Sequence, residues 1–97
     1  MKYRIDLAPD ARGHFHALSA YERAKVRDAI DEHLADHPQM ETKCRIKRLR
    51  GLKRPQYRLR VDDLRVFYDI DAELVTVVGI VAKDQADEWL SETGDRP

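Results

Sequence analysis

The spacing of apolar residues predicts a strand and then a helix at the start of the chain. Residues 2–7 alternate between polar and apolar, and three apolar side chains share one face: Tyr3, Ile5 and Leu7. Such alternation is typical of a strand with one buried face. A proline then interrupts the pattern, and Asp10 is predicted to cap a short helix that carries Phe15 and Leu18.

A longer helix is predicted to follow. Ser19 and Glu22 have the spacing of a capping box, in which each side chain binds the other residue's backbone N–H. The helix should end near Asp36, because the residue before Pro38 disfavours helical geometry. Its apolar residues recur every four positions and form one buried stripe: Val26, Ile30 and Leu34. The pattern therefore predicts two antiparallel helices joined by a short turn.

The second half of the chain has the pattern of three strands and a helix. Residues 57–61 and 65–70 alternate, and two aspartates between them offer a tight turn. Residues 74–82 are almost continuously apolar, which predicts a strand in the middle of a sheet. Asp84 is placed to cap a last helix with three apolar residues on one face: Ala86, Trp89 and Leu90.

The predicted order is β-α-α-β-β-β-α, which belongs to the α+β class. We expect a small antiparallel sheet with the helices, the helical hairpin among them, packed on one face. Residues 1–93 are predicted to form one domain, since no repeat, low-complexity tract or linker divides the 97-residue chain. Residues 94–97 are predicted to be a frayed tail.

Charge is distributed very unevenly along the chain. The 18 Lys and Arg balance the 18 Asp and Glu, so the formal net charge is zero. Residues 43–65, however, carry a net charge of about +8, whereas the segments before and after carry about −2 and −6. A local field of this kind favours a polyanionic partner, although the acids and bases could also neutralise one another across the surface.

Composition excludes several other classes of protein. The one cysteine, Cys44, excludes an internal disulfide framework and a cysteine-rich zinc site, and no metal site or cofactor is expected. The longest apolar run is much shorter than the roughly 20 residues that span a bilayer, and no signal-peptide core follows the first residue. We therefore expect a cytoplasmic protein without a membrane partner.

Three arginines are predicted to meet on the face of the sheet opposite the core. Arg58 and Arg60 alternate with the apolar residues of their strand, and Arg65 has the same parity in the next strand. Guanidinium groups suit phosphate oxygens, and Phe67 on this face offers a surface on which a base could stack. The nearby basic residues should add phosphate contacts: Lys43, Arg45, Lys47, Arg48, Arg50, Lys53 and Arg54. The alternative is that the arginines pair with acidic residues of the chain.

Few side chains near the predicted arginine face could transfer a proton. Arginine stays protonated, so it can stabilise charge on a phosphate but does not act readily as a base. The four histidines all lie in the helical half of the chain, away from the predicted arginine face. Lys83, at the end of the last strand, is the best candidate for proton transfer. Cys44 lies among basic residues, but no histidine is near it in sequence.

Three motifs in this order resemble the RelE/ParE superfamily of toxins. They are Arg48-Leu49-Arg50-Gly51-Leu52, then Tyr57-Arg58-Leu59-Arg60-Val61, then Leu64-Arg65-Val66-Phe67-Tyr68-Asp69-Ile70. The resemblance covers essentially the whole chain and implies the toxin of a type II toxin–antitoxin module. In the RelE branch such a toxin cleaves mRNA in the ribosomal A site as an endoribonuclease, and in the ParE branch it inhibits DNA gyrase.

The resemblance to the RelE branch implies catalytic roles for four residues. Arg58, Arg60 and Arg65 would hold and polarise the scissile phosphate, and Lys83 would stand in for an arginine after the fourth strand. The chain departs from the branch at Asp84, beside that position, and at Leu90, near the place of a tyrosine. The RelE-like activity is the first expectation; a ParE-like gyrase inhibitor or a non-catalytic, antitoxin-binding relative are the alternatives.

The resemblance also implies the partners. A cognate antitoxin is expected, in a toxin–antitoxin hetero-oligomer, because such antitoxins wrap a segment around their toxin. The RelE-like activity further implies the ribosome and mRNA as partners, whereas the ParE-like activity implies DNA gyrase.

Overall fold

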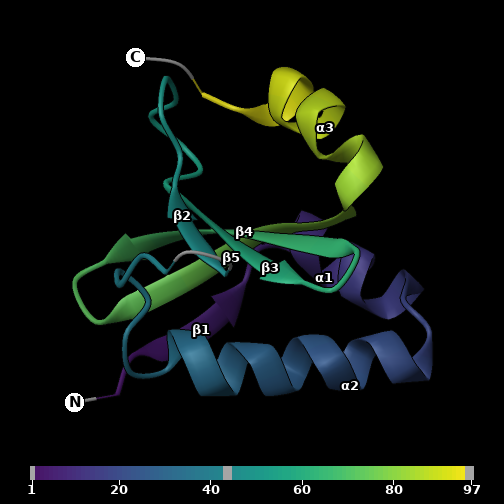
Figure 1. The fold of residues 1–97 in the computed structure, drawn as a ribbon, viewed down its shortest axis with the longest axis horizontal. Helices are drawn as coiled ribbons and strands as arrows, with labels where there is room; N and C mark the ends of the chain where they lie inside the picture. The colour runs from purple at the N-terminus through teal and green to yellow at the C-terminus, as the bar shows by residue number, and fades with distance from the viewer. Residues whose placement is uncertain (1, 43–44, 96–97) are drawn as a thin grey trace.

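A five-stranded mixed sheet forms the middle layer of the molecule, in the order β1-β5-β4-β3-β2 (Figure 1). The computed structural model describes residues 2–42 and 45–95. The strands are β1 (Arg4–Leu7), β2 (Ile46–Arg48), β3 (Tyr57–Val61), β4 (Leu64–Asp71) and β5 (Leu74–Ala82). The helices are α1 (Pro9–Ala17), α2 (Ala20–Ala29) and α3 (Ala86–Thr93), with a π-helical turn at Ile30–Leu34 and a 3₁₀ turn at Lys83–Gln85. No helix within the described ranges is both long and apolar enough to cross a membrane.

The predicted α+β class is confirmed, and the sheet differs from the expected one in two respects. β1 pairs parallel to β5, with Ile5 opposite Val75, so the sheet is mixed and not purely antiparallel. The short strand β2 was not predicted; it pairs antiparallel with β3 at the sheet edge, with Ile46 opposite Leu59. Three residues are too few to show a period of two, and parallel pairing with β5 brings together segments about 70 residues apart, a contact that no local pattern encodes.

α1 and α2 cover one face of the sheet, as the hairpin prediction required (Figure 1). The capping box at the start of α2 is complete, because Glu22 N–H donates to Ser19 Oγ at 3.1 Å and Ser19 N–H donates to Glu22 Oε1 at 3.0 Å. The prediction that Asp10 caps α1 was wrong, since Ala8 is the N-cap and Pro9 is the first helical residue. Proline fits there because its missing N–H would have no helical partner and its φ is already helical.

The core lies between these helices and the sheet. The predicted stripe of α2 and the turn after it is buried, with Val26 and Leu34 inaccessible to solvent. Tyr68 of β4 is equally buried; its ring stacks on that of Tyr57 at 5.4 Å between centroids, and its hydroxyl donates to Pro38 O at 2.6 Å. Burial raises the pKa of Tyr68 well above its ordinary value. The hydroxyl therefore stays a donor, which keeps the segment after the helices attached to the sheet.

α3 lies on the opposite face of the sheet from the hairpin, whereas the sequence placed all helices on one face (Figure 1). Its N-cap is Gln85 and not the predicted Asp84, which lies within the 3₁₀ turn. Its anchor is Trp89, whose ring stacks on Phe67 of β4 with centroids 5.1 Å apart and an interplanar angle of 16°. The ring occupies the space that Gly79 of β5 leaves by having no side chain. An aromatic pair of this kind contributes about 0.5–1.5 kcal/mol beyond the area it buries.

The chain beyond α3 is paired and not frayed as far as residue 95. Asp95 forms a short antiparallel bridge with Arg54 in the β2–β3 loop, in which Asp95 N–H donates to Arg54 O at 2.8 Å and Lys53 N–H donates to Asp95 O at 2.6 Å. α3 is therefore attached to the rest of the molecule at both of its ends. The remainder of the predicted tail, residues 96–97, lies outside the described residues.

Replacing Gly79 by alanine should loosen α3, because the added Cβ would overlap the Trp89 ring. Overpacking of this kind costs about 1–3 kcal/mol. We expect a lower melting temperature by circular dichroism and a red-shifted tryptophan emission. The matched control is Gly13→Ala in α1, where an added Cβ meets nothing within 4 Å; it should stabilise the protein by about 0.5–1 kcal/mol. Equal stability of the Gly79→Ala variant and the unchanged protein would contradict this packing.

Candidate nucleic-acid interface

The pairing of β3 with β4 brings the three predicted arginines together. Arg60 lies directly opposite Arg65, and Arg58 lies two pairs further along, opposite Phe67. The apolar neighbours of these arginines along β3 and β4 are buried in the core: Leu59, Val61, Leu64 and Val66. All three arginines therefore project from the other face, the one that carries α3. The sequence therefore predicted correctly which face these side chains share.

The arginines of this face repel one another, and two of them, Arg58 and Arg65, are partly buried. The pKa of Arg65 is lowered, chiefly by burial and then by the neighbouring charges of Arg58 and Arg60. Its Nη1 donates to two backbone carbonyls at 2.9 Å, those of Asp62 and Leu64, which fix the guanidinium in place. Like charges directly opposite each other in a sheet are destabilising. The arrangement costs stability and is suited to receiving an anion.

Arg58 carries the clearest sign of a missing partner. Its Nε is the only buried side-chain nitrogen or oxygen within the described residues that has no hydrogen-bond partner. Leaving a buried donor unpaired costs about 1–3 kcal/mol, and more for a charged group. A bound anion on this face would supply the acceptor that the protein itself does not.

Some of the basic residues before β3 lie beside the arginines on this face of the sheet, and others lie on the β2–β3 loop. Lys47 lies opposite Arg58 on β2 and extends the arginine row to the sheet edge. Arg45 is adjacent, because its carbonyl accepts a hydrogen bond from Arg60 N–H at 2.8 Å. Arg50 and Lys53 are exposed on the β2–β3 loop. The predicted contact Lys43 lies outside the described residues, as does Cys44.

Two of the predicted phosphate contacts have structural partners of their own. Arg48 lies opposite Tyr57 on the hairpin side of the sheet, with its guanidinium carbon 5.1 Å from that ring. Arg54 forms an ion pair with Asp69, Nη1 to Oδ2 at 3.4 Å, and Asp69 is 5% exposed. The structure therefore separates Arg48 and Arg54 from the arginine row. The Arg54–Asp69 pair joins residues that are 15 positions apart in the sequence. Their proximity depends on the path of the β2–β3 loop, so the spacing in the sequence did not predict this pair.

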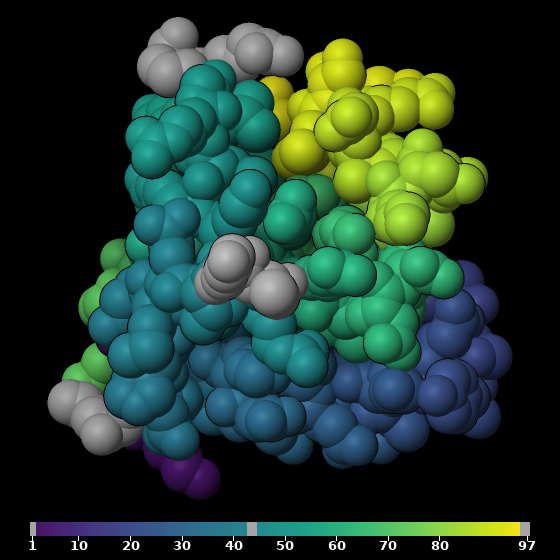
Figure 2. All heavy atoms as spheres, in the orientation of Figure 1, coloured from purple at the N-terminus to yellow at the C-terminus, as the bar shows by residue number. Residues whose placement is uncertain are grey.

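Phe67 is on the expected face but is not open to a nucleic-acid base. It is inaccessible to solvent because Trp89 covers it. The predicted stacking role therefore does not fit Phe67 in this structure. Figure 2 shows the β2–β3 loop and α3 as two neighbouring ridges that rise above the strands.

The groups available for proton transfer lie apart from the row or at its end. Lys83 follows β5 directly and is exposed, and its backbone N–H donates a hydrogen bond to Asp63 O at 2.8 Å. Val81, two residues earlier, is opposite Arg65, so Lys83 adjoins the end of the arginine row. His14 accepts a hydrogen bond at Nδ1 from Ile80 N–H at 3.1 Å, which caps the free edge of β5. Within the described residues, no three His, Cys, Asp or Glu side chains gather as metal ligands.

Comparison with known proteins finds one family and one fold. Residues 5–87 match the model of a family described as the ParE toxin of the type II toxin–antitoxin system parDE. A mutant of the Escherichia coli toxin RelE in the free state has a TM-score of 0.72 at 24% identity, covering 95% of this chain and 94% of that one. The toxin–antitoxin complex RelBE2 from Mycobacterium tuberculosis gives 0.68 at 22% identity, covering 84% and 99%. The RelB–RelE antitoxin–toxin complex from Methanococcus jannaschii gives 0.67 at 14% identity, covering 87% and 96%. No curated protein sequence matches significantly.

The repulsion within the arginine row can be measured as stability. Replacing Arg60 by glutamine removes the charge opposite Arg65 and should stabilise the protein by about 0.2–1 kcal/mol in urea unfolding at low salt. The gain should shrink at 1 M salt, where the Debye length is about 3 Å. Arg4→Gln, at an exposed position of β1, is the control and should change little. A loss of stability in Arg60→Gln at low salt would show that Arg60 makes attractive contacts that outweigh the repulsion.

Proposed function

The chain belongs to the ParE toxin family of type II toxin–antitoxin systems, within the RelE/ParE superfamily, and from the geometry of its arginine row we propose that it inhibits translation by cleaving mRNA on the ribosome. The observation that carries the proposal is the row formed by Arg58, Arg60 and Arg65, with its one unpaired buried donor on Arg58. A phosphodiester of single-stranded RNA offers the acceptors that this row requires.

The proposed chemistry is attack of a ribose 2′-hydroxyl oxygen on the adjacent phosphorus, with the hydroxyl proton passing to solvent water. The bond from phosphorus to the 5′-oxygen breaks, which leaves a 2′,3′-cyclic phosphate on one fragment and a 5′-hydroxyl on the other. The arginines stabilise the charge that develops on the phosphate oxygens, and in many enzymes such preorganised donors supply most of the rate acceleration. Lys83, at the end of the row, is the group we assign to protonating the leaving oxygen.

A cognate antitoxin is the proposed protein partner, in a hetero-oligomer with the toxin. Two of the solved structures with this fold are complexes of a toxin with its antitoxin. An antitoxin that presents carboxylates would neutralise the arginine row directly, and this is how we propose that it blocks access of RNA.

Gyrase inhibition is the second candidate, and the poor supply of acid–base groups favours it. Tyr57 and Tyr68 project to the hairpin side of the sheet, and the Nδ1 of His14 is engaged by a backbone amide. In this candidate function the arginine row would bind another protein or DNA without cutting a strand.

Alanine at both Arg60 and Arg65 should abolish the toxicity of the protein on induced expression. Pulse labelling should show that the unchanged protein stops amino-acid incorporation, with A-site cuts visible by primer extension, and that the double variant does neither. Lys2→Ala/Arg4→Ala removes two exposed positive charges from the opposite end of the sheet and should stay toxic. Full toxicity of the arginine double variant would remove the row from the mechanism.

Pulse labelling in the same cells and one further assay distinguish the two candidate functions. In one outcome, growth-arrested cells continue to incorporate label, and purified gyrase loses its supercoiling activity at excess toxin. This outcome would contradict the translation proposal and support gyrase inhibition. Normal supercoiling together with A-site cuts would exclude gyrase as the target.

A further inference from the structure

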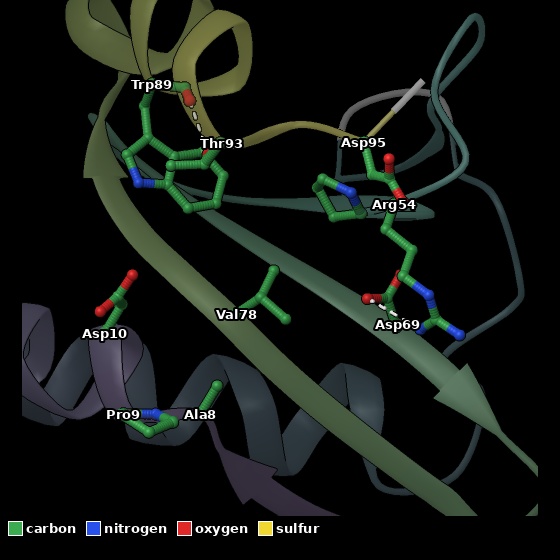
Figure 3. A pocket seen from close by; sticks show the side chains of 10 residues that line it. Ala8, Pro9, Asp10, Arg54, Asp69, Val78, Trp89, Thr93 and Asp95 are labelled. Carbon is green, nitrogen blue, oxygen red and sulfur yellow. Dashed lines mark hydrogen bonds and ion pairs between the residues drawn. The ribbon is translucent and has the colours of Figure 1, made fainter. Parts of the chain in front are cut away.

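A cleft of about 400 Å³ lies between the start of α1 and α3 (Figure 3). Its floor is apolar and includes Val78, at the point where the register between β4 and β5 shifts. Trp89 forms one wall, the start of α1 a second, and the β2–β3 loop with Asp95 a third. None of the three predicted arginines lines it.

The charges that line this cleft are mostly negative. Asp10, Asp69 and Asp95 face a single positive group, the Arg54 guanidinium. Asp69 is already satisfied, because it pairs with Arg54 and its Oδ1 accepts Gln56 N–H at 2.7 Å. Asp10 and Asp95 are exposed, and neither has an ion-pair partner within the described residues. The cleft therefore has an excess of acid in a region next to a strongly basic face.

The remaining walls suit the stem of a long side chain. Trp89 is half-buried, with one ring face on Phe67, and its ring forms a T-shaped pair with that of His14 at 6.3 Å between centroids. In Figure 3 its ring and the Asp10 carboxylate stand on the same side of the cleft, with Val78 between them and Arg54. Lysine and arginine bury an aliphatic stem on apolar surface, keep the charged head near carboxylates, and gain from a nearby indole.

We propose that this cleft receives a lysine or arginine side chain of the antitoxin. The inference rests on the proposed antitoxin partner and adds where one basic residue of that partner binds. An antitoxin segment with acids over the arginine row and one base in the cleft would match both signs of charge. Like-charge contacts would then disfavour the reversed orientation, so the two sites together fix how the segment lies.

The single tryptophan makes the cleft directly observable. Trp89 is the only tryptophan of the chain, so emission excited at 295 nm reports on this wall alone. We expect N-acetyl-arginine amide to change that emission saturably at millimolar concentration, and N-acetyl-glutamine amide to leave it unchanged at equal ionic strength. Asp10→Asn and Asp95→Asn should each weaken the response at least about twofold, as expected for loss of an exposed ionic contact. Asp28→Asn, exposed on α2 on the other side of the sheet, should have no effect.

Three outcomes would overturn the proposal. They are a response that does not saturate, an equal response to the glutamine analogue, and an unchanged affinity in the Asp10→Asn/Asp95→Asn variant whose near-ultraviolet circular dichroism is native. The purified toxin–antitoxin complex should give no response, because its cleft is filled; a full response there would exclude the antitoxin as the occupant. The Arg60→Ala/Arg65→Ala variant should still bind the arginine analogue, so failure of the proposed function and failure of this inference are separate results.

Discussion

The register between β3 and β4 is the constraint on which the rest of the structure depends. Leu59 and Val66 face the helical hairpin because they are opposite each other in that register, and Arg60 and Arg65 then necessarily meet on the other face. A slip of one residue would bury the arginines and expose the core residues. Burial of the apolar residues on one face of the sheet therefore holds the arginine charges close together on the other face. Their mutual repulsion lowers the stability of the fold.

Local sequence was sufficient for those features whose partners are near in the chain. The capping box needs only Ser19 and Glu22, and the alternation of β3 alone places Arg58 and Arg60 on one face. Both were predicted correctly because their geometry is set within a few residues. The same is true of the stripe that ends at Leu34.

Features that depend on distant partners were missed or misplaced. Phe67 looked like an open stacking surface because nothing near it in sequence shows that Trp89, 22 residues later, will cover it. The side of the sheet on which α3 lies follows from that same contact and from the space at Gly79. Arg54 looked like a phosphate ligand, and its pairing with Asp69 depends on how the β2–β3 loop turns back. The local pattern of a single sequence carries no information about such contacts.

The bridge between Asp95 and the β2–β3 loop has a practical consequence for anyone who handles this protein. Asp95 lies beside Lys53 and Arg54, at the edge of the basic region, whereas β1 begins at the opposite end of the molecule (Figure 1). A purification tag at the carboxyl end would therefore emerge next to the surface that is meant to be assayed. Fusion at the amino end leaves both that surface and the terminal bridge undisturbed.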